Sequence, residues 1–317
     1  MLVVLEGPDG GGKSTLATRL ANHVVSQGKT AFITHVGPPL DLARCPFDEY
    51  ETELDSLPMA EAIRSTKVMV IMDRWHLGEY VYGPVYRGGS RYTEAGVYHT
   101  ELALQAKGAV RVMCLPSYPE TERRFLGRGD DLIDVADLEE LWTRYHGLLH
   151  RFGYWQVTGS EDVGDLVRTL YREAMASTER MFSPALWSGG TYIGSNRPDV
   201  LFVGDERGNG PKGRPDLRRP FTPTLRGSSS EYLLSSLLTA GLRDRVGIVN
   251  SREERVDLAS LWKSLLHPPV VALGNKASDR LTAIGLQHRK VYHPQYMRRF
   301  RHGDRFEYAQ QLKEGLT

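Results

Sequence analysis

The sequence has very little cysteine and no long hydrophobic run. Of its 317 residues only two are cysteine, Cys45 and Cys114, and neither belongs to a CxxC pair. Two isolated cysteines exclude a disulfide framework and a structural zinc site, and we expect both to be small buried side chains in a reducing compartment. No stretch approaches the roughly 20 apolar residues that span a bilayer, and no secretory signal is expected. We therefore expect a cytoplasmic protein without a membrane partner.

The overall composition is that of a globular chain, but its charge is unevenly distributed. Apolar residues make up 40% and charged residues 25%, and the length allows two domains of roughly 150 residues each. Residues 1–182 carry 19 Lys+Arg and 26 Asp+Glu, a net −7, whereas residues 183–317 carry 21 and 13, a net +8. An acidic half joined to a basic half indicates nucleic-acid contact by the basic half, although a solvated basic face would give the same imbalance.

Hydrophobic patterning predicts an α/β fold with two three-layer domains, residues 1–182 and 183–317. In the first domain we expect strands at 2–5, 30–34, 68–72, 110–115 and 154–157, with helices at 14–27, between the later strands and at 162–181. In the second we expect strands at 200–203, 246–249, 270–273 and 290–292, helices at 231–240, 253–266 and 276–284, and two terminal helices. Strands that alternate with helices favour parallel sheets, and a loop over 183–196 would join the domains.

A glycine-rich loop between the first strand and the first helix carries the strongest motif. Residues 7–14 read GPDGGGKS and match the phosphate-binding pattern G-x-x-x-x-G-K-[ST]. The glycines let backbone N–H groups surround phosphate oxygens, Lys13 can reach the β- and γ-phosphates, and the Ser14 hydroxyl can bind Mg²⁺. The loop predicts ATP and Mg²⁺ as cofactors. The expected nucleotide-binding residues are Gly7, Asp9, Gly10, Gly11, Gly12, Lys13, Ser14 and Thr15.

Three segments of the first half resemble the thymidylate kinase family over residues 1–180. They are VVLEGPDGGGKST at 3–15, VIMDRW at 70–75 and RRFLGRGDD at 123–131. The resemblance implies a P-loop kinase domain in which Asp9 lies near the acceptor and a mobile lid brings arginines to the transferring phosphoryl group. It implies the catalytic residues Lys13, Asp73, Arg74, Arg124 and Arg128, with Arg123 also in the lid and with Ser14 and Asp73 on the metal. Without the resemblance, the lid arginines could be a solvated helix face, and Asp73 and Arg74 a structural ion pair.

The segments around the acceptor depart from this family. THVGPPLD at 34–41 lacks the arginine with which the family holds a nucleotide's 5′-phosphate. The stretch between the strand expected at 30–34 and Asp73 is also short for the family's acceptor-binding helices. The segment after Arg74 instead combines tyrosines and arginines, namely Tyr80, Tyr82, Tyr86, Tyr92, Arg87 and Arg91. This mixture suits stacking on bases and pairing with phosphates, or else ordinary packing. A free nucleoside monophosphate is therefore a less suitable acceptor than the family resemblance implies.

Five segments of the second half resemble the uracil-DNA glycosylase superfamily over residues 198–302. They are LFVGDERG at 201–208, RRPFTP at 218–223, GIVN at 247–250, VVALG at 270–274 and VYHPQ at 291–295. The resemblance implies base-contacting roles for Asp205 (water), Phe221 (stacking), Asn250 (uracil edge) and His293 (carbonyl), and Arg298, Arg299 and Arg301 suit backbone phosphates. Glu206-Arg207-Gly208 and Gln295 depart from the family pattern. An active glycosylase, a base-recognising domain that does not cleave, and a structural remnant all remain open.

Three functions fit these features. The favoured one is an ATP-dependent kinase that phosphorylates the hydroxymethyl group of 5-hydroxymethyluracil in DNA, because the chain resembles phage 5-hydroxymethyluracil DNA kinases; it would then act in the host cytoplasm. Its partner would be DNA, a pyrimidine base held through the basic half. The alternatives are a dTMP kinase fused to an active or relic uracil-DNA glycosylase, and a DNA-binding module with an ATP switch. For the acceptor hydroxyl, Asp73 is the first candidate base and Asp9 the second.

Overall fold

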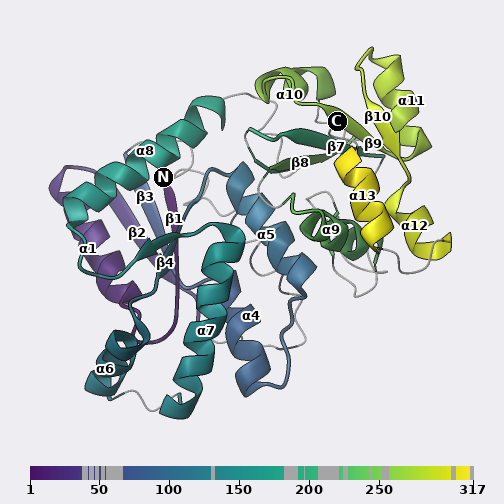
Figure 1. The fold of residues 1–317 in the computed structure, drawn as a ribbon. Coiled ribbons are helices and arrows are strands. Elements are labelled where there is room, and N and C mark those ends of the chain that lie inside the picture. The colour runs from purple at the N-terminus through teal and green to yellow at the C-terminus, as the bar shows by residue number, and fades with distance from the viewer. Residues whose placement is uncertain are drawn as a thin grey trace. The chain divides into compact units, whose positions relative to one another are not determined.

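The computed structural model has two compact units. It describes residues 1–37, 42, 46, 50, 54, 67–129, 133–181, 192–195, 197–205, 221–223, 228–242, 245–251, 257–300 and 305–314. Unit 1 comprises residues 1–92 and 108–176, and unit 2 comprises residues 93–107 and 177–317. The expected boundary after residue 182 differs from this division because a helix from the first half of the chain belongs to unit 2 (Figure 1).

Unit 1 is built on a five-stranded sheet in the order β2-β3-β1-β4-β5, and every pairing in it is parallel. Its strands are β1 (Leu2–Glu6), β2 (Thr30–His35), β3 (Val68–Asp73), β4 (Val110–Cys114) and β5 (Trp155–Val157). Its helices are α1 (Lys13–Ser26), α4 (His76–Tyr86), α6 (Tyr118–Arg128), α7 (Val135–Phe152) and α8 (Val163–Met181). These bounds lie within a few residues of the expected strands and helices.

Both faces of the first sheet are covered. Val3 and Leu5 of β1 pack with Leu20 of α1 and Leu170 of α8 in one hydrophobic core. Successive strand residues point to opposite faces, and Val4 between them is equally inaccessible to solvent. A fully buried parallel strand explains why β1 is apolar without alternation until Glu6. Cys114 is buried at the end of β4, where burial raises the pKa of its thiol to about 12, and Cys45 lies outside the described residues.

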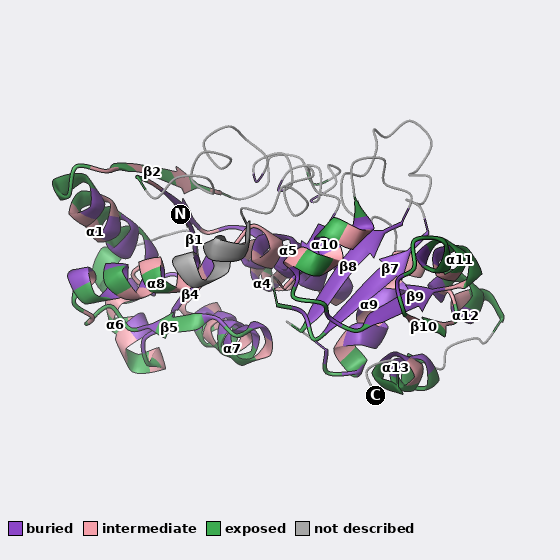
Figure 2. Cartoon of the chain, turned by 90° about the horizontal axis from the view of Figure 1, so that it is seen from above, coloured by how far each residue is buried: buried purple, intermediate pink, exposed green. Residues whose placement is uncertain are grey.

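Unit 2 has a second five-stranded sheet, in the order β10-β9-β7-β8-β6. Its strands are β6 (Tyr192–Gly194), β7 (Val200–Gly204), β8 (Val246–Asn250), β9 (Val270–Leu273) and β10 (Arg289–Val291). Its helices are α5 (Glu94–Ala106), α9 (Ser229–Thr239), α10 (Leu258–Ser264), α11 (Asn275–Ala283), α12 (Pro294–Phe300) and α13 (Arg305–Glu314). Figure 2 shows the central strands β7, β8 and β9 as buried.

Two features of unit 2 differ from the expectation. Strand β6 runs antiparallel to β8, with Ile193 opposite Ile248, so the sheet is not wholly parallel and part of the expected 183–196 loop is a strand. Helix α5 packs against β6 and α9, and the Tyr98 hydroxyl donates to the carbonyl oxygen of Leu242 at 2.9 Å. No helix in the described part of the chain is long and apolar enough to cross a bilayer.

Candidate active site

The glycine-rich loop joins β1 to α1 at the carboxyl edge of the first sheet. Gly7 and Gly10 have positive φ values of 143° and 77°. A Cβ on Gly7 would lie 2.3 Å from the carbonyl oxygen of Cys114, and one on Gly10 would lie 2.4 Å from that of Thr121. The loop therefore requires glycine both for its backbone conformation and for its close approach to neighbouring chain.

Lys13 is buried under this loop and bound to it. Its ammonium donates to the carbonyl oxygens of Gly7 and Pro8 at 2.8 and 2.7 Å. Burial lowers the pKa of Lys13, and the carboxylates of Asp73 and Glu6 oppose that shift. Two carbonyl contacts hold the charge at the place where the phosphates of a nucleotide would replace them.

Ser14 and Asp73 form a pair that fits a magnesium ion. The Ser14 hydroxyl donates to Asp73 Oδ2 at 2.6 Å, and Asp73 Oδ1 is buried without a hydrogen-bond partner among the described residues. No group of three metal-binding side chains occurs in the described residues. Mg²⁺ commonly takes one or two protein ligands and completes its octahedron with water and phosphate oxygens, so two oxygens beside the loop suffice.

Helix α6 carries the predicted lid arginines. Arg124 donates from Nε to Glu120 Oε1 at 2.6 Å, and Arg123 binds both Glu120 oxygens at 2.8 Å; these contacts lower the pKa of Glu120 to about 2. A Cβ on Gly12 would lie 3.3 Å from Arg124 Nη1, so this guanidinium lies over the glycine-rich loop. Arg128 is close enough to help lower the pKa of Lys13. Arg124 and Arg128 are thus near the glycine-rich loop and Lys13, whereas the Arg123 side chain is 72% exposed.

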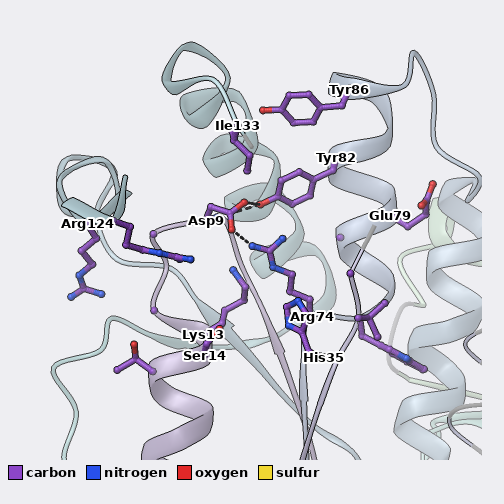
Figure 3. Close-up of a pocket in the computed structure, with 18 of the residues that line it drawn as sticks. Asp9, Lys13, Ser14, His35, Arg74, Glu79, Tyr82, Tyr86, Arg124 and Ile133 are labelled. Atoms are coloured by element: carbon purple, nitrogen blue, oxygen red, sulfur yellow. Dashed lines mark hydrogen bonds and ion pairs between the residues drawn. The ribbon is translucent and has the colours of Figure 1, made fainter. Parts of the chain in front are cut away.

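Asp9 joins the loop to the opposite wall of the pocket. The Tyr82 hydroxyl donates to Asp9 Oδ2 at 2.9 Å, and Arg74 forms an ion pair with Asp9 Oδ1. Arg74 also lies over the Tyr82 ring, 5.6 Å from its centroid, and Tyr82 stacks on Tyr86 with centroids 6.2 Å apart. In Figure 3, Lys13 lies on one side of Asp9, and Tyr82 and Tyr86 lie on the other.

The turn that carries Arg74 is held by Glu6 at the end of β1. Glu6 is fully buried, and its Oε1 accepts hydrogen bonds from the backbone N–H groups of Trp75 and Leu77 at 3.1 and 3.0 Å. Arg74 itself has a φ of 65°, which a non-glycine residue adopts at a cost of about 1–3 kcal/mol. The carboxylate cap stabilises this strained turn and fixes the direction of the Arg74 side chain.

Arg87 and Arg91, which follow the tyrosines, share one buried carboxylate. Arg87 and Arg91 both bind Glu79, with Nη2–Oε2 distances of 2.8 and 3.2 Å. The Glu79 carboxylate is 1% exposed, so it can be buried because two guanidiniums neutralise it. Tyr92 is 2% exposed and packs against Tyr50. Ordinary packing therefore accounts for Tyr92, whereas Arg87, Tyr82 and Tyr86 line the pocket described below.

Many of these groups line one pocket of about 900 Å³ in unit 1. It extends from Gly10, Gly12, Lys13, Ser14 and Thr15 to Arg74, Tyr82 and Tyr86, and Arg123, Arg124, Arg128 and His35 also line it. His35, the last residue of β2, was not predicted as a site residue, and its Nδ1 lies 3.4 Å from Asp73 Oδ2. The available signal was its position, since ligands bind at the carboxyl ends of parallel strands.

Unit 2 also gathers polar side chains at the carboxyl ends of its strands. Asn250 ends β8, and Asp205 and His293 follow β7 and β10. A Cβ on Gly204 would lie 2.6 Å from Asn250 Oδ1 and 2.7 Å from the Phe221 ring, so both side chains contact the end of β7. Asn250 is 1% exposed, and neither its Oδ1 nor its Nδ2 has a hydrogen-bond partner among the described residues. Buried side-chain amides without a hydrogen-bond partner are rare, so this amide is available to a bound molecule.

Asp205 and His293 lie near each other's charge and near the ammonium of Lys276. Lys276 Nζ is 3.4 Å from Asp205 Oδ2, and the Ser251 hydroxyl donates to the Asp205 carbonyl oxygen at 3.1 Å. Burial lowers the pKa of His293, and the Asp205 charge opposes this shift. His293 Nδ1 accepts from the Gln295 N–H at 3.1 Å, which leaves Nε2 as the proton donor of a neutral ring.

Only some of the remaining predicted residues of unit 2 lie in the described part of the chain. Arg298 and Arg299 lie on α12, directly after His293, and Arg299 is exposed. Arg301 and the departing turn Glu206-Arg207-Gly208 lie outside the described residues. Phe221 has a φ of 54°, a conformation that a bulky side chain adopts rarely. Asp205, Phe221, Asn250 and His293 thus come from four segments to one edge of the sheet.

Comparisons with known proteins find likeness at the level of solved structures. No protein-family model matches the chain, and no curated protein matches it in sequence. The YorR protein of Bacillus subtilis in complex with phosphorylated GDP is 20% identical, covers 56% of this chain and 98% of its own, and has a TM-score of 0.41. Deoxyadenosine kinase from M. mycoides with dCMP and dCDP is 15% identical over 56% of this chain and 100% of its own, with a TM-score of 0.34. Structural similarities this low do not indicate the function of the chain, which must be inferred from its own residues.

Proposed function

We propose that the protein is an ATP-dependent kinase that phosphorylates the hydroxymethyl group of 5-hydroxymethyluracil in DNA. The observation that carries the proposal is the pocket of unit 1, which joins a phosphate-binding loop to a wall of stacked tyrosines. Its volume of about 900 Å³ is near the upper end of the roughly 300–1,000 Å³ typical of ligand pockets. One pocket of this size has room for a triphosphate on one side and a base on the other.

The phosphate side supplies positive charge to the group in transfer. Lys13 exchanges its two carbonyl contacts for phosphate oxygens, and Arg124 and Arg128 approach from α6. Phosphoryl transfer depends mainly on positioning and on neutralising charge at the equatorial oxygens. Ser14 and Asp73 would hold Mg²⁺, which when bound supplies further charge neutralisation at the β- and γ-phosphates.

The acceptor side must orient a primary alcohol and take its proton. Tyr82 and Tyr86 offer ring faces to the base, and Arg74 stays paired with Asp9 beside them. The acceptor oxygen forms a bond to Pγ while the bond from Pγ to the β–γ bridging oxygen breaks, and ADP leaves. Both oxygens of Asp9 are occupied, whereas Asp73 Oδ1 has no hydrogen-bond partner among the described residues, which favours Asp73 as the proton acceptor.

Asp73 would then serve both the metal and the acceptor, and this can be tested. Asp73→Asn should abolish transfer at every magnesium concentration, because it removes the base together with a ligand. Asp9→Asn should raise the Michaelis constant for the acceptor while turnover falls less, because it disturbs Arg74 and Tyr82. The reverse pattern would assign the proton to Asp9.

Unit 2 would hold the DNA and recognise the pyrimidine. The net positive charge of residues 183–317 supports contact with phosphates. The buried amide of Asn250, which has no hydrogen-bond partner among the described residues and lies near Phe221, suits the imide edge of a stacked pyrimidine. Lys276 pairs with Asp205 and thereby neutralises the carboxylate that would activate water. This contact supports base recognition without cleavage. Treatment of uracil-containing DNA should therefore release no uracil, and release above that of an Asp205→Asn control would contradict this.

The decisive experiment compares acceptors. The full chain is incubated with γ-labelled ATP and, separately, dTMP, plain DNA and DNA that contains 5-hydroxymethyluracil. Label should appear in the modified DNA alone, and Lys13→Ala should abolish it while thermal unfolding stays cooperative. Label in dTMP would instead identify a nucleoside monophosphate kinase. Hydrolysis of ATP without any labelled acceptor, stimulated by plain DNA, would identify an ATP switch.

A further inference from the structure

Exposed aromatic rings form a continuous stack on the surface of unit 2. Tyr292, Tyr296 and Phe300 are 50%, 41% and 67% exposed. The ring centroids of Tyr292 and Tyr296 are 5.1 Å apart with planes inclined by 24°, and those of Tyr296 and Phe300 are 5.2 Å apart. We call these three side chains the aromatic ladder. Contiguous exposed apolar surface marks an interaction site, whereas single exposed rings are common.

Packing within the described chain does not account for the ladder. Helix α12 already buries Pro294 and Met297, so it has an apolar face toward the core of unit 2. Tyr296 and Phe300 are four residues apart and therefore form a second stripe on its surface. The ladder is also held at its base, because the buried Tyr308 donates from its hydroxyl to the carbonyl oxygen of Tyr292 at 2.8 Å. The backbone of Tyr292 is thus held in place, while the three rings are left in solvent.

Positive charge flanks the aromatic ladder. Residues 286–300 contain Arg289, Lys290, Arg298 and Arg299 and no Asp or Glu. Arg299 is exposed on α12, and Lys290 is exposed on the edge strand β10, which immediately precedes the ladder (Figure 1). An apolar protein partner would gain from the rings but not from the charges of Lys290 and Arg299. A nucleic-acid strand gains from both, because its bases stack on the rings and its phosphates pair with the cations.

We propose that the aromatic ladder binds the unpaired bases of single-stranded DNA. A duplex conceals its base faces within its own stack, so rings that lie open on a surface can stack only on bases outside a duplex. The ladder begins at Tyr292, which precedes His293 in the sequence. Under the proposed function Asn250 takes the edge of one base, whereas the ladder takes the faces of other bases without reading their sequence. This binding is separate from phosphoryl transfer and needs no ATP.

Fluorescence anisotropy with the full chain tests the proposal. The probes are a short fluorescein-labelled oligothymidine and the duplex that it forms with oligoadenosine, measured without ATP over a salt series. Tyr296→Ala and Phe300→Ala should each weaken binding of the single strand by about ten-fold, because one stacked base is lost. Phe306→Ala is the matched control, since Phe306 is 78% exposed on α13 outside the ladder. It should leave binding unchanged.

Two further variants separate stacking from other causes. Tyr296→Leu keeps an apolar side chain of similar reach, so it should fold as the parent does and still lose the single-strand affinity. Arg299→Ala should lower the slope of binding against salt by about one, whereas the ring variants should not change it. Thermal midpoints of all variants confirm that the fold is retained.

Three outcomes would contradict the proposal. Equal losses for duplex and single strand would mean that the ladder does not require unpaired bases. Affinity in the double variant Tyr296→Ala/Phe300→Ala that matches the Phe306→Ala control would overturn the proposal outright. A parent dimer that the double variant converts to monomer in light scattering would assign the ladder to a second copy of the chain. None of these outcomes depends on whether the chain is a kinase.

Discussion

Replacement of Arg124 should lower turnover far more than it weakens ATP binding. Arg124 keeps its Nε on Glu120, and its Nη1 lies next to Gly12 of the phosphate loop. Nη2 lies near Gly159, and under the proposed function both Nη groups would donate hydrogen bonds to the transferring phosphoryl group. Two charge-assisted hydrogen bonds of about 1.5–3 kcal/mol each amount to about 3–6 kcal/mol, so Arg124→Ala should lower kcat about 10²–10⁴-fold.

The ground state should change little, because the charge on the equatorial oxygens develops during transfer. The Michaelis constant for ATP should therefore stay within a few-fold of the parent value. Arg123→Ala is the matched control: this arginine binds the same Glu120, but its side chain is 72% exposed. Initial rates with labelled ATP at saturating acceptor give both constants. A raised Michaelis constant with unchanged kcat for Arg124→Ala, or an equal loss for Arg123→Ala, would refute the role.

Three other predictions concern the scaffold. Glu79→Ala leaves the guanidiniums of Arg87 and Arg91 without their shared carboxylate. The free energy of unfolding measured in urea should therefore fall by about 3–5 kcal/mol, and Glu79→Gln should lower it less. Burial lowers the pKa of His293, so the unfolded chain binds a proton at this residue at a higher pH than the folded chain does. The free energy of unfolding should therefore fall as the pH drops below about 6.5. His293→Gln should make the urea midpoint less sensitive to pH in that range. Residues 183–317 expressed without residues 93–107 should not unfold cooperatively in circular dichroism, whereas the full chain should; a cooperative transition in the fragment would contradict the placement of α5.

The conformation of the glycine-rich loop could be predicted from sequence because its requirements are local. The glycines at 7, 10, 11 and 12 are demanded by backbone conformation and by close neighbours, and the flanking strand and helix are contiguous with them. Asp73 was equally accessible to prediction, since it ends an apolar strand that parallel pairing brings next to β1. Where one segment and its immediate neighbours determine a feature, spacing alone is informative.

Pairings between distant side chains could not be predicted in the same way. The motif of tyrosines and arginines suggested phosphate contacts, but a glutamate eight residues before Arg87 binds that arginine and Arg91 within the protein. His35 carries no motif, and it becomes a site residue only when β2 pairs with β3 in the register that places it opposite Asp73. The strand β6 has three residues and gains its stability from β8, so its own composition indicates a loop.

Helix α5 shows why the domain boundary was the hardest feature to predict. A helix between two parallel strands normally covers the sheet that contains them, and α5 lies between β3 and β4 in sequence. Ten of its thirteen residues are buried, however, including the polar His99, Thr100 and Glu101, so it has no solvated face. A helix that is buried all round must have partners on several sides, and α5 finds them in β6 and α9 of unit 2. Because the chain leaves unit 1 at residue 92 and returns at residue 108, unit 2 includes a helix from the first half of the chain. Residues 183–317 therefore lack one helix of the unit to which they belong, and no boundary at a single linker separates the two units.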